Sequence, residues 1–444
     1  MSGDRADKPR LNRRDVRGGV RGDIKSVQRV YLFLLTLQTL SASLIWGVNT
    51  LFLLDAGLSN FEAFGVNAFF TLGMVLFEIP TGVIADSFGR RLSYLLGTVT
   101  LIVTTALYVL LWKTHASLWA WALVSIGLGL GFTFFSGAVD AWLVDAMADA
   151  NDADKAPADL LERTFGRGQI VIGASTLIGS VAGGYIAQIS SLGMPYLIRV
   201  GFLVINLVAA FFLMFDRGFT PPEKESPLKQ MRSLLRVSID KGFGNPSLKW
   251  MMLTSPFLGG VMFYVFYAMQ PYLLALYGDK TAYGIAGLAA AIVAGAQMVG
   301  GASVGWVSRR FQSRVSLILA ATILGSVFLT LMFVLTSFWI TIVLLVVWAL
   351  IFAVVTPVRQ TYLNKRIESK NRATLLSFDS VLNSAGSVVT QPALGKTADL
   401  FGYPASYLTC AVLQACAIPL LIIARRYDAG GGEKTTSTIS TSER

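Results

Sequence analysis

The chain has 444 residues, of which 14% are charged and 54% belong to the apolar set that excludes glycine. A typical soluble domain carries about 25% charged residues, so the composition excludes an ordinary water-soluble enzyme. Apolar runs of about 18 or more residues recur along the sequence, and each is long enough to cross a hydrocarbon core about 30 Å thick. We therefore expect an all-α protein that crosses a membrane many times.

Cysteine and histidine are too scarce for a disulfide scaffold or a thiolate metal site. Cys410 and Cys416 both lie in the last apolar run, and the chain has one histidine. That single histidine leaves no Ser-His-Asp set and no zinc motif. The net charge of +11 is spread between the apolar runs instead of forming one basic domain. We predict no enzymatic activity, no cofactor, no metal and no nucleic-acid partner.

Apolar runs separated by polar breaks predict twelve transmembrane helices. Most of the 37 Lys and Arg residues fall in the tails and in the loops on the side of the amino terminus. By the positive-inside rule, both termini are then cytoplasmic and the protein spans the plasma (inner) membrane. The expected helices are 30–54, 61–85, 92–112, 118–147, 167–190, 196–215, 250–277, 282–307, 314–335, 338–363, 372–398 and 404–424.

The longest polar segment inside the chain, 216–249, divides these helices into six and six. We predict a first six-helix bundle at 30–215 and a second at 250–426, joined by a cytoplasmic linker at 216–249. The ends of the chain are rich in Arg, Asp, Gly, Ser and Thr. Such compositions bury too little apolar surface to fold, so we predict disordered cytoplasmic tails at 1–29 and 427–444.

The two halves repeat one another at an offset of about 219 residues, so that the bundles are pseudo-symmetric. A repeated half is typical of a transporter, because a site at the interface of the halves can face either side of the membrane. We expect a monomer that moves a small-molecule substrate through the lipid bilayer. The offset places Gly82, Arg90, Arg91 and Asp140 on Gly301, Arg309, Arg310 and Arg359.

The strongest local motif lies where the second helix leaves the membrane. Gly82, Asp86, Gly89, Arg90 and Arg91 have the order and spacing Gly, three residues, Asp, two residues, Gly, Arg, Arg. This motif and its position resemble the signature of the major facilitator superfamily. The resemblance extends over all twelve helices and implies two six-helix bundles that work by alternating access.

The resemblance also implies a role for this motif as a latch between the two halves on the cytoplasmic side. The gate residues would be Gly82, Asp86, Gly89, Arg90, Arg91 and, from the fourth helix, Asp145.

Further segments resemble the branch of this family that contains tetracycline-resistance-type drug:proton antiporters. They are residues 77–82, 136–145 and 270–272. In helix five, Gly179, Gly183 and Gly184 are placed as in the antiporter signature, with Ser180 where the signature has proline. Glycines at this spacing also occur wherever membrane helices pack closely, and both interpretations stay open.

Ionisable side chains inside the membrane are candidates for coupling transport to an ion. Each costs about 2.5 to 3.5 kcal/mol on insertion scales and therefore calls for a partner or a role. The candidates are Glu78, Asp140, Arg359 and Asp379. We hypothesise that Asp140 and Arg359 approach one another across the central cavity, as an ion pair or an anion contact. Alternatively, each side chain reaches the headgroup region separately.

Glu78 has two interpretations. An apolar environment favours the neutral form of a carboxyl group, which suits a proton carrier. Its counterpart in the repeat, Gln297, does not titrate, so a carrier role would be confined to the first half. Glu78 would otherwise form a structural hydrogen bond that holds helix two.

Helices one and seven supply the candidate substrate contacts. Aromatic faces combined with a few amides suit amphipathic or cationic organic molecules. Aromatic side chains in membrane helices also serve as packing or interface residues. The candidates are Trp46, Asn49, Phe263, Tyr264, Phe266, Tyr267 and Gln270.

Together these features predict a secondary transporter that exports small amphipathic organic compounds in exchange for protons. One alternative keeps the fold and makes the protein a metabolite importer or uniporter. A second alternative is a nontransporting membrane sensor or scaffold, which would require a partner-binding domain that the short polar tails do not supply.

Overall fold

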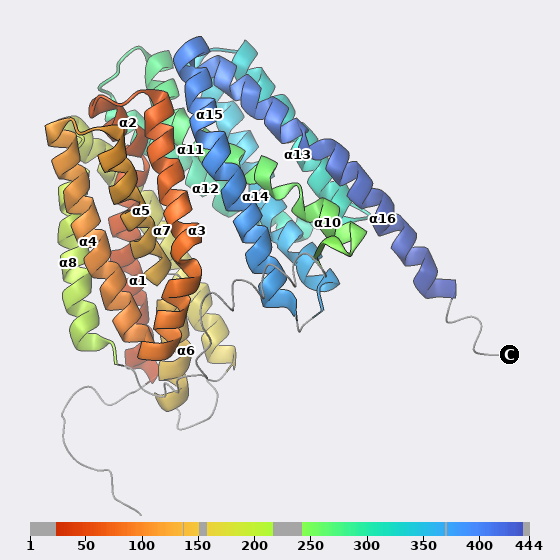
Figure 1. Ribbon diagram of the computed structural model, residues 1–444, viewed down its shortest axis with the longest axis horizontal. Helices are drawn as coiled ribbons and strands as arrows, with labels where there is room; N and C mark the ends of the chain where they lie inside the picture. The colour runs from red at the N-terminus through yellow and green to blue at the C-terminus, as the bar shows by residue number, and fades with distance from the viewer. Residues whose placement is uncertain (1–23, 136, 151–157, 216–241, 369–370, 438–444) are drawn as a thin grey trace, which may run out of the picture.

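The computed structural model describes residues 24–135, 137–150, 158–215, 242–368 and 371–437 (Figure 1). All regular structure within these ranges is helical, which confirms the all-α prediction. A polypeptide in hydrocarbon must satisfy its backbone hydrogen bonds internally, and helices do so within one segment. The tail residues 1–23 and 438–444 and most of the linker lie outside the described residues.

Two helical bundles lie side by side, with the red-to-yellow first bundle and the green-to-blue second bundle in Figure 1. The first bundle contains α1 (Ile24–Trp46), α2 (Asn49–Asp55), α3 (Asn60–Phe88), α4 (Arg90–Thr114), α5 (Leu118–Phe135), α6 (Ala138–Ala150), α7 (Ala158–Ile189) and α8 (Met194–Leu213). The second bundle contains α10 (Pro246–Met252), α11 (Ser255–Tyr277), α12 (Tyr283–Ser308), α13 (Arg314–Val334), α14 (Phe338–Arg366), α15 (Arg372–Ala415) and α16 (Ala417–Ser437).

The described segments match the twelve predicted spans. Eleven helical stretches are long and apolar enough to cross a membrane, and the last of them is Thr374–Asp428. This stretch is broken at Gly402, whose φ of 82° lies in the left-handed region. Glycine adopts that conformation without the steric cost that a Cβ imposes. Dividing the stretch at Gly402 gives the expected helices eleven and twelve.

Several helix bounds differ from those expected. Helix one is divided into α1 and α2, helix four into α5 and α6, and helix seven into α10 and α11. At the outer ends α1 begins at Ile24 and α16 continues to Ser437, so parts of both assigned tails are helical. Hydropathy marks only the hydrocarbon-spanning part of a helix, whereas polar turns continue it into the headgroup region.

The turn between α3 and α4 is sharp because Gly89 has a φ of 101°. At its other end, α3 begins with a capping box. The Ser59 Oγ accepts a hydrogen bond from the Glu62 backbone N–H, and the Glu62 carboxylate accepts one from the Ser59 N–H. This reciprocal cap satisfies two backbone donors that a helix start leaves free.

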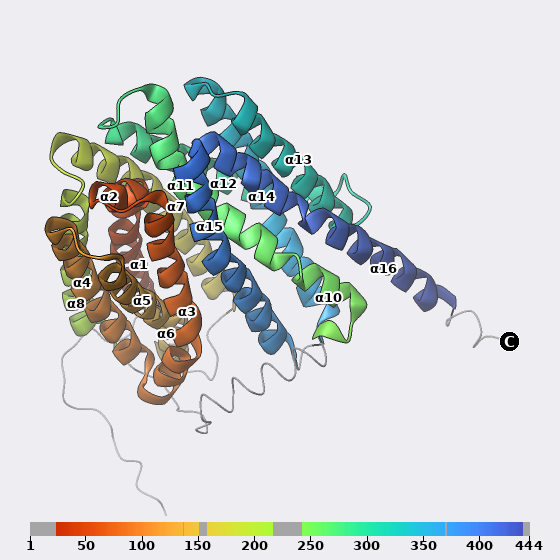
Figure 2. The same ribbon diagram turned by 45° about the horizontal axis from the view of Figure 1, so that its top comes forward.

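Two ends of the molecule are distinguished below. The basic end carries the α3–α4 turn with Arg90 and Arg91 and the α12–α13 turn with Arg309 and Arg310. The contact end is the opposite one, where α2 and the start of α3 lie (Figure 2) and where Tyr403 of α15 is hydrogen-bonded to Asn60 of α3. The equivalent positions of the two arginine turns agree with the repeat found in the sequence.

Candidate functional site

The two bundles are joined at the contact end by a carboxylate that caps a helix. Asp399 of α15 accepts hydrogen bonds from the backbone N–H groups of Asn60 and Phe61, at 2.9 and 2.8 Å. It also accepts one from the Asn60 side chain at 2.9 Å. The Tyr403 hydroxyl donates to the Asn60 side-chain oxygen at 2.6 Å. An anion at a helix N-terminus is favourable because the free N–H groups point at it, so this contact holds α15 to α3.

Gln270 of α11 forms a second connection between the bundles. Its amide nitrogen donates to the Trp46 carbonyl oxygen at 2.7 Å, and its amide oxygen accepts from the Thr50 N–H at 3.0 Å. Trp46 and Thr50 flank the break between α1 and α2, where carbonyl and N–H groups lack helical partners. Gln270 is fully buried and satisfies one group on each side of the break.

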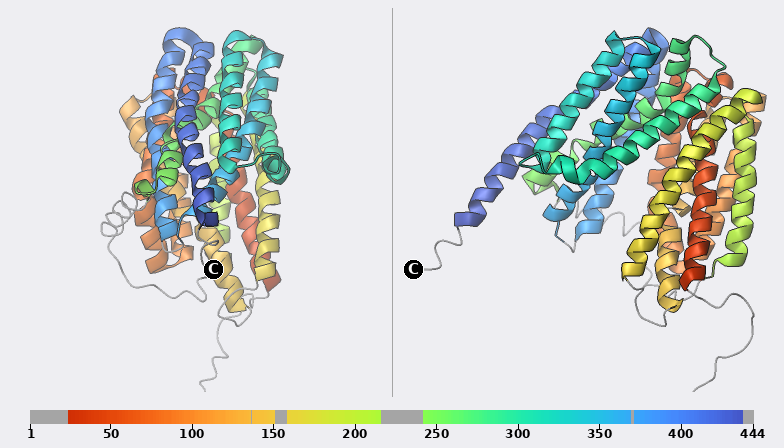
Figure 3. Two further views of the ribbon diagram at one scale, coloured as in Figure 1. Left: turned by 90° about the vertical axis from the view of Figure 1, so that its right-hand side faces the viewer. Right: turned by 180° about the vertical axis from the view of Figure 1, so that it is seen from behind.

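Helices α7 and α12 approach each other at a pair of glycines, as the yellow and green helices in the rear view of Figure 3 show. A Cβ added to Gly184 would lie 2.7 Å from the Tyr283 carbonyl oxygen and 2.8 Å from the Gly287 Cα. Small residues permit such backbone contact between membrane helices.

Glycines 179 and 183, which accompany Gly184 in the predicted antiporter motif, instead face Ser43 and Leu44 of α1 in their own bundle. The motif therefore serves packing both within the first bundle and between the bundles.

At the basic end, the predicted gate residues interact within the first bundle. Arg90 donates to Asp86 at 2.6 Å, and its Nε lies 3.9 Å from the Asp145 carboxylate. Arg91 donates to the Phe211 carbonyl oxygen at 2.7 Å and lies over the Phe211 ring. These contacts join α3, α4, α6 and α8, with Gly82 on the exposed side of α3 and Gly89 at the turn. A latch to the second bundle remains a prediction.

Asp140 and Arg359 form no ion pair with each other in this structure, because each has another partner. Asp140 accepts a hydrogen bond from the Tyr31 hydroxyl at 2.9 Å, inside the first bundle. Arg359 pairs with Asp379 of α15 in the second bundle, with N–O distances of 2.5 and 2.6 Å. Positions that are equivalent in two repeats are related by symmetry, and symmetry alone does not bring their side chains together.

The ion pair of Arg359 and Asp379 is supported by further hydrogen bonds, and only the Nε of Arg359 lacks a partner among the described residues. Arg359 also donates to the Ser255 hydroxyl at 2.5 Å and to the Met251 carbonyl oxygen at 3.2 Å. Ser255 in turn donates to Asp379 at 2.7 Å. The two charged side chains are 13% and 11% exposed. Bidentate, charge-assisted hydrogen bonds are stronger than those between neutral groups. The cluster therefore holds α11, α14 and α15 against each other.

Glu78 differs from these groups because its side chain is exposed and makes no hydrogen bond or ion pair with any described residue. Its expected alternative role as a structural hydrogen-bonding group is therefore not found. Phe64, fourteen residues earlier on α3, packs its ring 4.4 Å from Tyr264 of the second bundle. Fourteen residues are about 21 Å and nearly four full turns. Glu78 thus lies on the side of α3 that faces the second bundle, far from the contact end.

The seven candidate substrate contacts divide into two groups. Asn49, Tyr264 and Gln270 are buried, and the carbonyl of Trp46 is bound by Gln270. Asn49 donates to Asn67 and accepts from Tyr196, so it serves packing inside the first bundle. The remaining three are more accessible: Phe263 is 40% exposed, and Phe266 and Tyr267 are partly buried with ring centroids 5.5 Å apart.

Arg199 of α8 is a residue whose importance the sequence did not indicate. It is 2% exposed, its Nε has no hydrogen-bond partner, and it forms no ion pair with a described residue. The groups that interact with it electrostatically are the hydroxyls of Tyr108, Tyr196 and Tyr267. These tyrosines come from α4, α8 and α11. Because they are far from one another in the sequence, the position of Arg199 near the end of an apolar run did not predict this environment.

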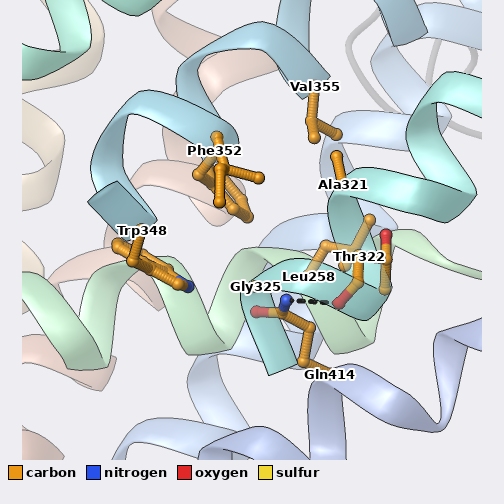
Figure 4. Close-up of a pocket in the computed structure, with 9 residues that line it drawn as sticks. Leu258, Ala321, Thr322, Gly325, Trp348, Phe352, Val355 and Gln414 are labelled. Carbon is orange, nitrogen blue, oxygen red and sulfur yellow. Dashed lines mark hydrogen bonds between the residues drawn. The ribbon is translucent and has the colours of Figure 1, made fainter. Parts of the chain in front are cut away.

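A small cavity inside the second bundle is shown in Figure 4. Gln414 donates to the Thr322 carbonyl oxygen at 3.0 Å, next to Gly325 and Trp348. The cavity volume is about 10 Å³, roughly the space for one water molecule. This volume is too small for an organic solute.

Comparison with known proteins supports the same fold. The family model described as Major Facilitator Superfamily matches residues 31–327 and 280–441. No curated protein matches the chain in sequence.

Solved structures match nearly the whole chain. The nucleoside transporter NupG, in a mutant form, has a TM-score of 0.71 at 14% identity and covers 90% of this chain and 99% of its own. A bacterial homolog of the human lysosomal transporter Spinster, inward-facing and unoccupied, has a TM-score of 0.67 at 15% identity, with 91% and 97% covered. A D-xylose–proton symporter has a TM-score of 0.65 at 16% identity, with 90% and 97% covered.

Proposed function

This chain belongs to the major facilitator superfamily, and we propose that it moves a small organic solute across the membrane by alternating access. One observation carries the proposal. The hydrogen bonds that Gln270, Asp399, Tyr403 and Gln188 form between the bundles all lie in the half toward the contact end. In the half toward the basic end, Asp140, Arg90 and Arg359 form their hydrogen bonds within their own bundles. A molecule joined at one end only is one state of a two-state rocking transporter.

The orientation follows from charge. The basic end concentrates Arg and Lys, and the positive-inside rule favours such segments on the cytoplasmic side. In that orientation the bundles would be closed toward the outside. The part of α3 near Glu78, which faces the second bundle, would be accessible from the cytoplasm. The outward-open state would then break the contacts of Asp399 and Gln270.

Glu78 is the group that we propose couples transport to protons. It faces the second bundle, is exposed, and has no partner among the described residues. A carboxyl group free of such partners can gain and lose a proton without breaking a structural contact. Asp379 and Asp140, the other acidic candidates, accept hydrogen bonds in this state and would have to release their partners first.

Export of amphipathic compounds is the direction that the drug:proton antiporter resemblance favours. The partly buried aromatic residues Phe266 and Tyr267 suit stacking on flat organic molecules. Import is a second candidate because two structural neighbours are named a nucleoside transporter and a D-xylose–proton symporter. A nucleobase also presents a flat aromatic face, so the same side chains suit either class.

Proteoliposomes with an imposed pH gradient test the proposal. The probes are ethidium, radiolabelled uridine and radiolabelled D-xylose, each followed with and without an uncoupler. We expect at least one probe to move faster in the presence of the protein and to accumulate with the gradient. If no probe and no solute of a wider metabolite extract moves, the protein is not a transporter and the sensor alternative stands.

Glu78→Gln separates coupling from transport. We expect gradient-driven accumulation to fall at least about tenfold, while exchange of labelled for unlabelled solute continues. Asp159→Asn is the matched control because Asp159 is an exposed carboxylate at the start of α7 without a described partner. Unchanged accumulation by the Glu78→Gln variant would remove Glu78 as the proton carrier.

A further inference from the structure

A second cavity lies at the basic end of the second bundle, away from the surfaces that join the bundles. Its volume is about 530 Å³. The walls come from the α12–α13 turn, the last turns of α14 and the middle of α16, with Phe311, Arg314, Lys365, Arg366 and Asp428 among the lining residues. The cavity is far larger than the one inside the bundle and is lined mainly by polar groups.

The charges around this cavity do not balance. Arg366 is paired with Asp428 and lies over the Tyr362 ring, with its guanidinium carbon 4.8 Å from the ring centroid. Arg314 and Lys365 are exposed and form no hydrogen bond or ion pair with a described residue. The cavity thus presents two cations whose charge no described carboxylate offsets.

The start of α13 adds to this positive field. Ser313 caps the helix by accepting a hydrogen bond from the Ser316 N–H at 3.1 Å, and Arg314 is the first helical residue. The N-terminus of a helix carries a partial positive charge, which favours an anion near it. The N-terminus of α13 and the side chains of Arg314 and Lys365 therefore all favour an anionic ligand.

The surroundings place the cavity at the depth of the lipid headgroups. Trp306, one turn before the α12–α13 turn, is 64% exposed and stacks under Arg310 at 4.8 Å. Tyr427 on α16 is also exposed. Exposed Trp and Tyr side chains are enriched at the membrane–water interface. Phe311 and Leu317 give the cavity an apolar wall beside its cations, which suits a molecule with an anionic head and a hydrocarbon chain.

We propose that this cavity binds the phosphate group of an anionic phospholipid, with Arg314 and Lys365 as its charged contacts. The lipid would link the α12–α13 turn to α14 and α16. This proposal does not depend on which solute the protein moves or in which direction. Basic pockets between transmembrane helices are a recurring way to hold acidic headgroups.

Thermal unfolding of the whole protein in a neutral detergent tests the proposal. Phosphatidylglycerol is titrated in, and phosphatidylcholine and sodium phosphate are titrated separately. We expect phosphatidylglycerol to raise the melting temperature and the other two to leave it unchanged. The double variant Arg314→Gln/Lys365→Gln should bind phosphatidylglycerol about 30-fold more weakly, since each cation near an anionic surface is worth about 1 kcal/mol.

Two controls make the result specific. Arg425→Gln/Arg426→Gln removes two exposed cations from the same stretch of α16 that do not line the cavity, and it should retain the wild-type affinity. Arg314→Lys/Lys365→Arg keeps both charges and should bind phosphatidylglycerol within about threefold of wild type, which separates lost binding from lost folding.

Three outcomes overturn the proposal. One is an equal loss in both neutral double variants, which indicates a diffuse surface attraction. Another is an equal shift with phosphatidylcholine. The third is a shift produced by sodium phosphate and not by phosphatidylglycerol, which assigns the cavity to a soluble phosphate.

Discussion

At the residue scale, Arg199 is the most unusual group in the first bundle. A cation without an acidic partner is costly inside a membrane protein, by about 2.5 to 3.5 kcal/mol on insertion scales. Its described surroundings are the hydroxyls of three tyrosines, one of which, Tyr267, belongs to the second bundle. Arg199 therefore lowers the free energy of unfolding of the bundle, and its presence suggests a role other than stability.

Replacing Arg199 with methionine should therefore stabilise the protein. Methionine has a similar length and no charge, so Arg199→Met should raise the free energy of unfolding by about 1 to 3 kcal/mol. Unfolding by sodium dodecyl sulfate in mixed micelles measures this change, and the proteoliposome assay measures transport. A large loss of stability would mean that the guanidinium is structural.

Arg359 provides the opposite case at the same scale. Because Asp379 and Ser255 bind its guanidinium, Arg359→Gln should leave a buried carboxylate uncompensated and cost about 3 to 5 kcal/mol. The double variant Arg359→Gln/Asp379→Asn removes both charges and should recover most of that loss. The same detergent titration measures all three variants. Additive losses in the double variant would show that the two side chains are energetically independent.

The sequence predicted which residues are polar and lie within the spans, but it did not predict which of them bind each other. Periodicity and the positive-inside rule located Glu78, Asp140, Arg359 and Asp379 within or near the spans because each interrupts an apolar run. Which of them meet depends on helix rotation and on contacts between segments such as α14 and α15, and a linear repeat contains neither. Arg199 was missed for the same reason, since its neighbours are distant in the sequence.

At the element scale, the sequence predicted the spans well and their breaks poorly. Long apolar runs gave every membrane helix, because length and hydropathy alone determine whether a segment can cross. The break between α1 and α2 carries no proline, and its stability comes from Gln270 on another helix. A helix break that is stabilised by a residue of the other bundle leaves no signal in the sequence around the break.

The contact of α7 with α12 supplies the prediction at this scale. A valine at position 184 has no room, because the atoms in its way are the backbone of Tyr283 and Gly287. Gly184→Val should therefore force the contact end apart and favour the state that is open there. Spin labels at Lys113→Cys and Lys280→Cys, with both native cysteines replaced by serine, should report a longer distance between the bundles.

Gly201→Val is the matched control because Gly201 is exposed on α8 and a Cβ there meets nothing within 4 Å. It should leave the label distance unchanged. An unchanged distance in Gly184→Val as well would indicate that the two helices adjust locally and that this contact does not govern opening.

At the scale of the whole molecule, the hydrogen bonds that join the two bundles at the contact end determine how easily the bundles can separate there. Each bundle has its own buried aromatic core, such as Phe52 stacked on Tyr196 in the first and Trp348 on Phe352 in the second. Most of each core lies within its own bundle, with Phe64 of α3 added to the second core and Leu274, Ala282 and Ala286 added to the first. The hydrogen bonds that join the bundles are few. Rocking would therefore exchange those few hydrogen bonds and the apolar contacts beside them, and it would leave most of each core in place.

Asp399 is the contact whose loss should shift this balance most directly. Its carboxylate accepts three hydrogen bonds from the start of α3, and the group is exposed, so we expect a contribution of about 1 kcal/mol. Asp399→Ala should then raise the population of the state open at the contact end about fivefold. Thr50→Cys, at a fully buried position of α2 whose backbone N–H is bound by Gln270 of the second bundle, reports the opening through its rate of alkylation by a membrane-impermeant maleimide.

The alkylation rate in the Asp399→Ala background should rise by the same factor of about five, with the native cysteines replaced by serine. Asp279→Ala is the control, because this exposed carboxylate at the same end accepts hydrogen bonds only from Thr281 in its own turn. It should leave the rate unchanged, since no contact between the bundles is lost. Equal rates in both backgrounds would mean that the α3–α15 contact is formed in both states, and opening would then have to occur by a movement other than the separation of α3 from α15.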